Sequence, residues 1–275
     1  MLGERPDLEE GRASVAVAWF VATCISVFCV HLLGWQPSVS LATVAGSASF
    51  AGTLMGILLA HELGHWLFAR WRGFRLSLPW FLPAPILVGT LGAIIRVEER
   101  PRTRDDLVGL GLSGPLAGLA AILLVLILRA GLGSAGLPSD WALSRPLLWW
   151  VVGAPLDHTV APTPTDPLGF AAWIGCLVTA MNLLPFGQLD GGHVLAGVAP
   201  WLPRRSAWLV TVLLLGLGLF WPPWAVWAAV LHLIGARHPL QVRDERPPLG
   251  ALGRGGAALA VVVFLLCFTP LPTSW

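Results

Sequence analysis

Long apolar runs alternate with short polar segments along most of the chain. A helix needs about 20 mainly apolar residues to cross a bilayer, because each residue adds about 1.5 Å. Runs that suit complete spans lie at about 13–33, 41–68, 106–128 and 168–184. Runs at 207–220 and 224–234 look short for complete crossings, and a last one covers 257–271. The pattern predicts an all-α polytopic membrane protein with about six to seven transmembrane helices.

The apolar stretch 76–97 breaks this helical pattern between the second and third spans. It carries Pro79, Pro83 and Pro85, and each proline removes a backbone donor and clashes with the preceding helical turn. Its later part, 88–97, is rich in residues that favour strands. Backbone at membrane depth must be covered by protein or line a cavity. We expect a re-entrant, partly β loop here, and an amphipathic segment lying on the membrane surface is the alternative.

Composition supports a membrane protein, and the positions of the charges predict its orientation. Of 275 residues, 56% are hydrophobic and 12% are charged, which is too apolar for an ordinary soluble domain. The net charge of +2 gives no reason to expect nucleic acid as a partner. All 17 basic residues are arginines, and only Arg129 and Arg145 fall in segments expected outside. The positive-inside rule then predicts a cytoplasmic amino terminus, in a cell inner or plasma membrane.

The acidic start of the chain predicts a retained first helix, because no basic segment or small-residue cleavage site precedes the first apolar run. We expect a cytoplasmic tail over 1–12 and a single integral-membrane domain over 13–275, with its core at about 41–200. Tryptophan is enriched at membrane–water interfaces. The best candidates for such interfacial residues, near the expected span ends, are Trp149, Trp150, Trp221 and Trp224. His31, near the end of the first span, is expected at the interface as well.

The third expected span carries closely spaced small residues, in the run from Ser113 to Gly118. Small residues let helices approach closely in lipid, so this span is predicted to be central in the bundle. A catalytic role for Ser113 is a weak alternative, because no partnered base follows from the sequence.

Chemistry is concentrated first in the motif His61-Glu62-Leu63-Gly64-His65, near the end of the second span. Two histidines four residues apart lie on one face of a helix and can bind one ion, with Glu62 beside any water on that ion. Ionisable groups are costly in hydrocarbon, so an intramembrane cluster is a candidate functional site. The motif predicts two zinc ligands and a general base.

A catalytic zinc ion usually has three protein ligands and one open position. The missing ligand is expected in the second polar stretch, which runs from Asn182 to His193. Asp190 is the best candidate, because it is the acidic residue in this apolar setting and the glycines after it allow close approach. Nearby, His193 is expected either to orient a ligand or to make a structural hydrogen bond, and Gln188 is a weaker candidate for lining the cleft.

The two motifs together, in this order and both in expected spans, resemble the site-2 protease family of intramembrane zinc metalloproteases. The resemblance covers about 41–200 and implies one Zn²⁺ held by His61, His65 and Asp190, with Glu62 as the base. It also implies hydrolysis of peptide bonds in or near transmembrane segments of membrane proteins. Asn182 is placed to donate a hydrogen bond to the peptide or its oxyanion. We expect the strand-like 88–97 to hold the unwound substrate by edge pairing.

Two readings from other classes compete with a protease. One is a catalytically silent relative that binds transmembrane helices, and the intact Glu62 and metal ligands count against it. The other is a transporter or metal channel, which is disfavoured by the general base and by the lack of an internal repeat.

Overall fold

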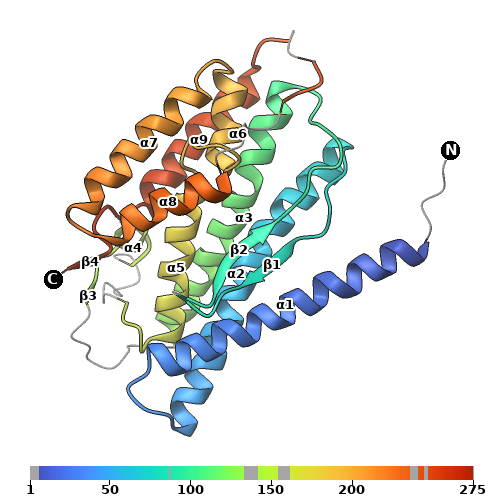
Figure 1. Ribbon diagram of the computed structural model, residues 1–275. Coiled ribbons are helices and arrows are strands. Elements are labelled where there is room, and N and C mark those ends of the chain that lie inside the picture. Colours follow the sequence, from blue (N-terminus) through green and yellow to red (C-terminus); the bar gives the residue numbers. More distant parts are fainter. Residues whose placement is uncertain are drawn as a thin grey trace.

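The computed structural model describes residues 6–86, 88–132, 142–153, 162–235, 241–244 and 247–274. Over these ranges the chain is mainly helical, with two small sheets (Figure 1). The helices are α1 (Pro6–Gly34), α2 (Leu41–Arg72), α3 (Arg104–Gly131), α4 (Leu147–Gly153), α5 (Pro167–Asn182), α6 (Asp190–Val198), α7 (Pro203–Gly218), α8 (Pro223–Gly235) and α9 (Ala251–Cys267). The strands are β1 (Trp80–Pro83), β2 (Thr90–Ile94), β3 (Ala142–Leu143) and β4 (Thr273–Ser274).

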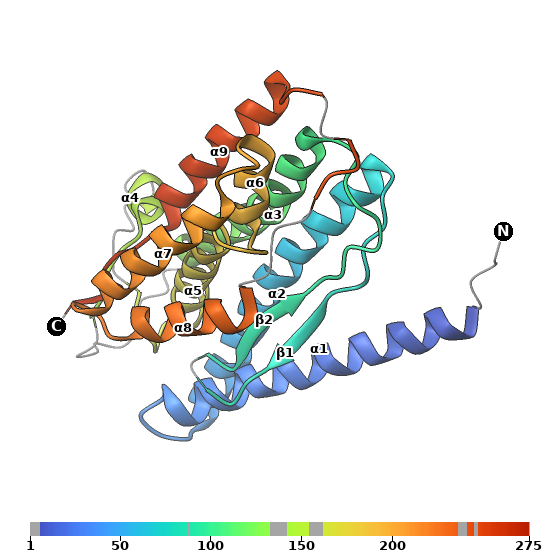
Figure 2. The same cartoon turned by 45° about the horizontal axis from the view of Figure 1, so that its top comes forward.

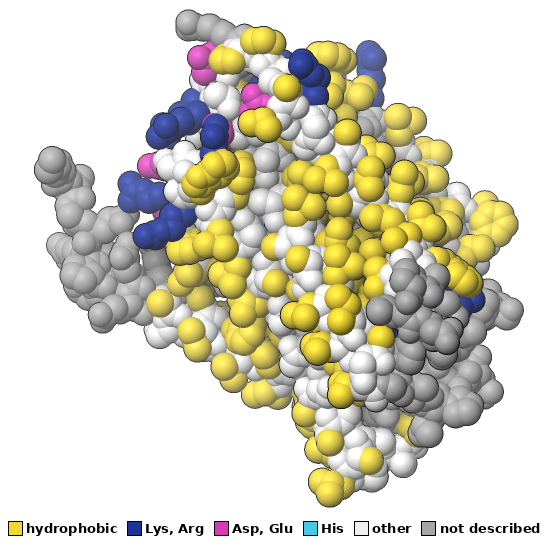
Figure 3. All heavy atoms as spheres, turned by 180° about the vertical axis from the view of Figure 1, so that it is seen from behind, with side chains coloured by type: hydrophobic (Ala, Val, Ile, Leu, Met, Phe, Trp, Pro, Cys, Tyr) yellow, Lys and Arg dark blue, Asp and Glu magenta, His cyan; other side chains and the backbone are white. Residues whose placement is uncertain are grey.

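Three of the described helices are long and apolar enough to cross a membrane, over Ala13–Gly34, Leu41–Arg72 and Arg104–Gly131. Shorter apolar helices cover Pro167–Asn182, Arg205–Gly218 and Ala251–Cys267. On the face seen in Figure 3, apolar side chains are widespread, while charged side chains gather mainly at one end. The mainly helical membrane fold is confirmed, and the number of crossings beyond these three helices stays a prediction.

Helices α2 and α5 run in the same direction, with α3 antiparallel to both. The start of α2 meets the start of α5, since Gly46 lies beside Pro167. Further along, Gly175 of α5 lies against Ile57 of α2 and Ile122 of α3. This three-helix arrangement lies behind the hairpin in Figures 1 and 2. Because α3 also contacts α6 and α9, it is central, as its small residues predicted.

Side-chain caps mark where the long helices begin. Ser40 and Thr43 form a capping box at the start of α2, and Thr103 and Asp106 form one at the start of α3. Helix α3 therefore begins directly after Thr103, its N-cap residue. Helix α2 ends at Gly73, whose φ of 73° is the left-handed conformation that glycine adopts readily.

The proline-rich stretch after α2 forms a β-hairpin. Strands β1 and β2 pair antiparallel, with Trp80 opposite Ile94, and an isolated bridge joins Leu76 to Val97. The turn approaches α1 so closely that a side chain on Gly89, which has a φ of 92°, would collide with the backbone of Val27. The hairpin runs along α1 and α2 (Figure 2), so the strand prediction is confirmed.

Several element boundaries differ from those expected. Helix α6 begins at Asp190, within the polar stretch from Asn182 to His193, because the acidic residue suits the first turn of a helix. The last helix begins at Ala251, six residues before its apolar run, and α1 begins at Pro6, inside the expected tail. The short pair of β3 with β4 was not expected from the pattern.

Two expected interfacial tryptophans and one histidine are buried instead. Trp149 and Trp224 are 2% and 0% exposed. The indole of Trp224 donates to the Pro270 carbonyl, so its polar group is satisfied inside the protein. His31 lies against Ser47 and the Pro164 carbonyl and stacks on the Phe50 ring. Trp224 and His31 therefore have polar partners inside the protein.

Candidate metal centre

His61 and His65 lie one helical turn apart in α2, and both are buried. The Nδ1 atom of His65 is 2.9 Å from the Leu110 carbonyl oxygen of α3. A carbonyl oxygen only accepts hydrogen bonds, so Nδ1 must carry the proton and donate. In the neutral ring the other nitrogen, Nε2, therefore presents a lone pair to the site.

The packing of α3 on α2 holds both rings in place. A side chain on Gly114 would collide with the His65 ring, and Gly118 lies beside the His61 ring. Gly64, between the two histidines, meets the Ser113 carbonyl and Ala117 so closely that a side chain would not fit. The small residues of α3 therefore make room for the imidazoles, which is a more specific role than close helix packing.

Asp190, the first residue of α6, reaches the same place from a distant part of the chain. A side chain on Gly191 would collide with the Leu183 carbonyl, and one on Gly192 with the Gly187 carbonyl. A side chain on Gly111 of α3 would collide with the Asp190 carbonyl. These three glycines allow the start of α6 to lie directly against α3 and the preceding turn.

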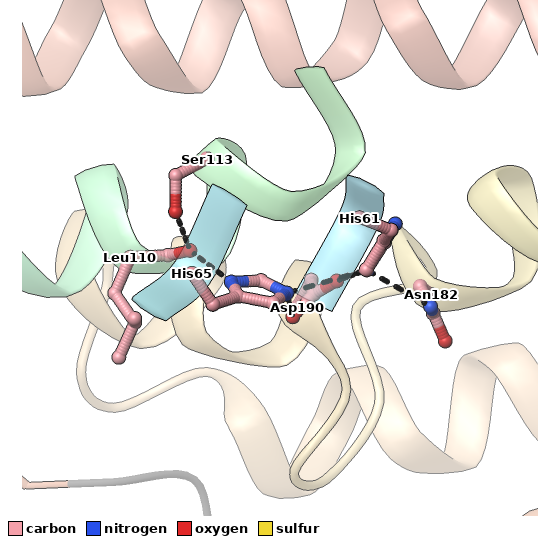
Figure 4. A network of polar contacts seen from close by, with 6 residues as sticks. All are labelled: His61, His65, Leu110, Ser113, Asn182 and Asp190. Atoms are coloured by element: carbon pink, nitrogen blue, oxygen red, sulfur yellow. Dashed lines mark hydrogen bonds and ion pairs between the residues drawn. The ribbon is translucent and has the colours of Figure 1, made fainter. Parts of the chain in front are cut away.

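The three side chains meet in one small cluster (Figure 4). The distances from Asp190 Oδ2 to His61 Nε2 and from Asp190 Oδ1 to His65 Nε2 are 3.1 and 3.3 Å. The two Nε2 atoms are 3.2 Å apart, and one ligand atom from each residue lies within 4.8 Å of the others. The structure therefore brings together the three residues that the sequence selected.

This donor set fits a zinc ion. Two imidazole nitrogens and a carboxylate are ligands that zinc commonly takes, and ligand atoms about 2.0–2.1 Å from one tetrahedral ion lie about 3.3 Å apart. The His65 lone pair and the Asp190 carboxylate face each other without a proton between them in the neutral form of the ring. A cation placed among them removes that repulsion, so the cluster suits a bound metal.

Asn182 and Glu62 lie beside this cluster. Asn182, the last residue of α5, has its amide nitrogen 3.3 Å from His61 Nε2 (Figure 4). Glu62 lines the same cavity as His61 and Asn182. The structure thus places both expected catalytic side chains next to the cluster of ligands.

The cavity that reaches this cluster has a volume of about 600 Å³. All five residues of β2 line one part of it. Other walls come from α5 and α8 and include Trp173 and Trp227. A mainly apolar cavity with a few polar groups at one place is typical of a binding site for an apolar ligand or peptide.

Other candidates from the sequence have different outcomes. The Ser113 hydroxyl donates to the Leu110 carbonyl, the same oxygen that accepts from His65, so its hydrogen bond is structural. Gln188 is exposed and does not line the cavity. His193 is buried one turn after Asp190, and its two expected roles stay predictions. The Leu110 carbonyl was missed, because a backbone atom leaves no signal in the sequence.

Comparisons with known proteins agree with this site. The model of peptidase family M50 matches residues 49–215, which include both histidines and Asp190. The chain is 33% identical over 234 residues to the probable zinc metalloprotease EGY1, chloroplastic, of Oryza sativa subsp. japonica. It is 31% identical over 234 residues to the protein of the same name from Arabidopsis thaliana. It is 28% identical over 260 residues to the probable zinc metallopeptidase EGY3, chloroplastic, of Arabidopsis thaliana.

These matches cover most of this chain but less than half of each relative. They span 80%, 80% and 83% of the chain, and 39%, 42% and 43% of the three relatives in the same order. The similarity therefore concerns the part of those proteins that corresponds to the helical core described above.

Proposed function

The chain belongs to peptidase family M50, the family of the site-2 proteases, and we propose that it is an intramembrane zinc endopeptidase. The convergence of His61, His65 and Asp190 on one point, beside Glu62, carries this proposal. A glutamate next to two histidine ligands is the arrangement of zinc peptidases that use the glutamate as general base.

In this proposal His61, His65 and Asp190 hold one zinc ion per chain. When bound, zinc polarises the scissile carbonyl and makes water acidic enough to deprotonate near neutral pH. The bond between His65 and the Leu110 carbonyl keeps the His65 ring in the orientation and tautomer that a ligand needs. The metal site therefore depends on α3 as well as on α2 and α6.

Glu62 takes the proton from the attacking water and passes it to the leaving amine as the peptide bond breaks. Asn182 donates its amide hydrogen to the scissile carbonyl oxygen, on which negative charge develops in the transition state. Its place at the end of α5, 3.3 Å from His61, supports this assignment.

The β-hairpin supplies a way to hold the substrate. A helical substrate hides its carbonyls in its own hydrogen bonds, so the segment to be cut must first become extended. The whole of β2 lines the cavity that contains His61 and Glu62, so an extended segment could pair with it near the site. We propose that the hairpin enters the bilayer as a re-entrant element, since β1 packs on α1 and β2 lines the cavity.

The proposed substrates are transmembrane segments of membrane proteins, which approach from the lipid bilayer. We further propose one integral-membrane domain over 13–275, with six to seven crossings. Exposed arginines cluster where α2 ends and α3 begins, at Arg70, Arg72, Arg75, Arg96, Arg100 and Arg102. Under the positive-inside rule this end faces the cytoplasm in a cell inner or plasma membrane.

The proposal can be tested with the purified chain in bilayer discs and a reporter that carries one transmembrane helix. The wild type is expected to contain zinc and to cleave the reporter. The Glu62→Gln variant is expected to keep its zinc and lose cleavage, because only the base is removed. A zinc-loaded wild type that cleaves none of several reporters would instead support a catalytically silent helix-binding protein.

A further inference from the structure

The first turn of α3, residues 103–106, contacts three other helices, two of which carry the proposed ligands. Asp106 accepts from Arg72 of α2 at 2.5 Å. Asp105 accepts from the Gly250 backbone at the start of α9. Arg104 points toward the carboxyl end of α6 and donates to the Gly197 and Val198 carbonyls, at 2.8 and 2.7 Å. One turn thus joins the helix of His61 and His65 to the helix of Asp190.

Helix α6 has little stability of its own. It contains nine residues, and isolated helices of this length are marginal in water. Three of the nine are glycines, which disfavour helix formation, and Leu189 supplies no side-chain cap at its start. Its position must therefore depend on contacts with the rest of the protein.

The Arg104 guanidinium donates two hydrogen bonds to the carboxyl end of α6. The last carbonyls of a helix lack partners within the helix and carry partial negative charge, so a cation there is favourable. Two hydrogen bonds from one charged group also fix direction as well as distance. A side chain on Gly197 would collide with Val108 of α3, so α6 is held tightly against α3 at this end.

From these contacts we infer that Arg104 is a positioning residue for the metal centre. It acts through α6, because a shift of this short helix along α3 moves Asp190 relative to the two histidines. The Arg72 and Asp106 pair fixes α2 on the same turn, so the distance between the ligand helices is set there. The inference rests on the proposed metal site, and it goes beyond the residues that contact the metal.

The test measures zinc affinity by chelator competition and the absorption spectrum of the cobalt-substituted protein, so it does not depend on cleavage. We expect Arg104→Gln to lower zinc affinity about tenfold, the lower end of effects seen for groups that support metal ligands, and to alter the cobalt spectrum. Arg104→Lys keeps the charge but not the pair of hydrogen bonds, so its zinc affinity should lie between those of Arg104→Gln and the wild type. Arg100→Gln is the matched control, because Arg100 is exposed in the same loop and should bind zinc normally.

The outcomes separate this inference from the proposed function. A folded Arg104→Gln variant with unchanged zinc affinity and cobalt spectrum would overturn the inference. If that variant does not fold, the folded Arg104→Lys variant decides, and an affinity equal to that of the wild type would overturn it. Wild-type protein that binds no zinc would instead remove the proposed metal site itself.

Discussion

Two clusters of buried polar groups lie at the two ends of α5, and they differ in how their charges are balanced. At the start of α5, Asp166 accepts from the Arg129 guanidinium at 2.6 Å, with the two side chains 0% and 2% exposed. At its end, Asn182 lies beside His61, His65 and Asp190, where lone pairs and a carboxylate face one another. The first cluster contains its own cation, Arg129, whereas a bound metal ion would supply the positive charge in the second cluster.

The difference distinguishes a structural buried charge from a functional one. Asp166 also caps α5 by accepting from the Gly169 backbone, so both of its oxygens have protein partners. Arg129 has one nitrogen, Nη2, without a partner in the described part of the chain. In the other cluster, the side chains of His61, His65 and Asp190 point toward one common position, and they do not pair as donor and acceptor as Arg129 and Asp166 do. Burial alone is therefore a weaker sign of function than burial of several acceptors around one place.

The largest expected effect comes from removing the anion of the second cluster. The Asp190→Ala variant should lose bound zinc and all cleavage, because two histidines are too few ligands for a catalytic site. Metal analysis of the purified protein measures this directly. Glu98→Ala, which changes an exposed acidic residue, is the control and should keep its zinc. Full zinc content in Asp190→Ala would show that Asp190 is not a ligand.

The next effect concerns the stability of the first cluster. Arg129→Met should lower the free energy of unfolding by about 3–5 kcal/mol, because it leaves the buried Asp166 charge without its partner. Zinc content per folded molecule should stay the same. Adding Asp166→Leu should restore much of the lost stability, since no buried charge then remains. If the Arg129→Met variant alone were as stable as the wild type, this would contradict a structural role for the pair.

A smaller change is expected for Asn182, at the boundary between α5 and the metal cluster. Asn182→Ala should lower kcat about a hundredfold, as for the loss of one oxyanion donor, and leave zinc content unchanged. Initial rates over a range of reporter concentrations separate kcat from KM. If zinc is lost together with activity, Asn182 supports the metal ligands and does not act on the substrate.

The smallest expected effect tests the hairpin edge. Leu91→Asp places a charge on β2 where it lines the cavity. We expect about tenfold lower kcat/KM, because an apolar substrate that pairs with β2 would cover this charge without supplying a polar partner. Leu78→Asp is a matched control, because both leucines are 43% exposed and Leu78 lies outside the cavity lining. Equal activity of the two variants would argue against substrate pairing with β2.

The sequence predicted the long spans and the convergence of three side chains for clear physical reasons. Twenty apolar residues in a row have few alternatives to a spanning helix, and two histidines four residues apart can only share one helical face. The boundaries of α6 and α9 were harder, because each begins in a polar or glycine-rich segment before its apolar run. The contacts of Arg104 with α6 and of the Leu110 carbonyl with His65 could not be predicted. Each joins segments that are far apart in the sequence, and the sequence does not show that these segments lie side by side.

The same direction of α2 and α5 also has a consequence for the synthesis of the protein. Two parallel helices must be separated by a returning one, so the ribosome produces α3 between the two parts of the site. Asp190 follows His61 by 129 residues, and at about 5–20 residues per second it emerges about 6–26 s later. During that time the nascent chain therefore has the proposed base and two of the proposed ligands, but the third proposed ligand is missing. In the proposed function, translation order alone would delay the onset of proteolytic activity until most of the core is in the membrane.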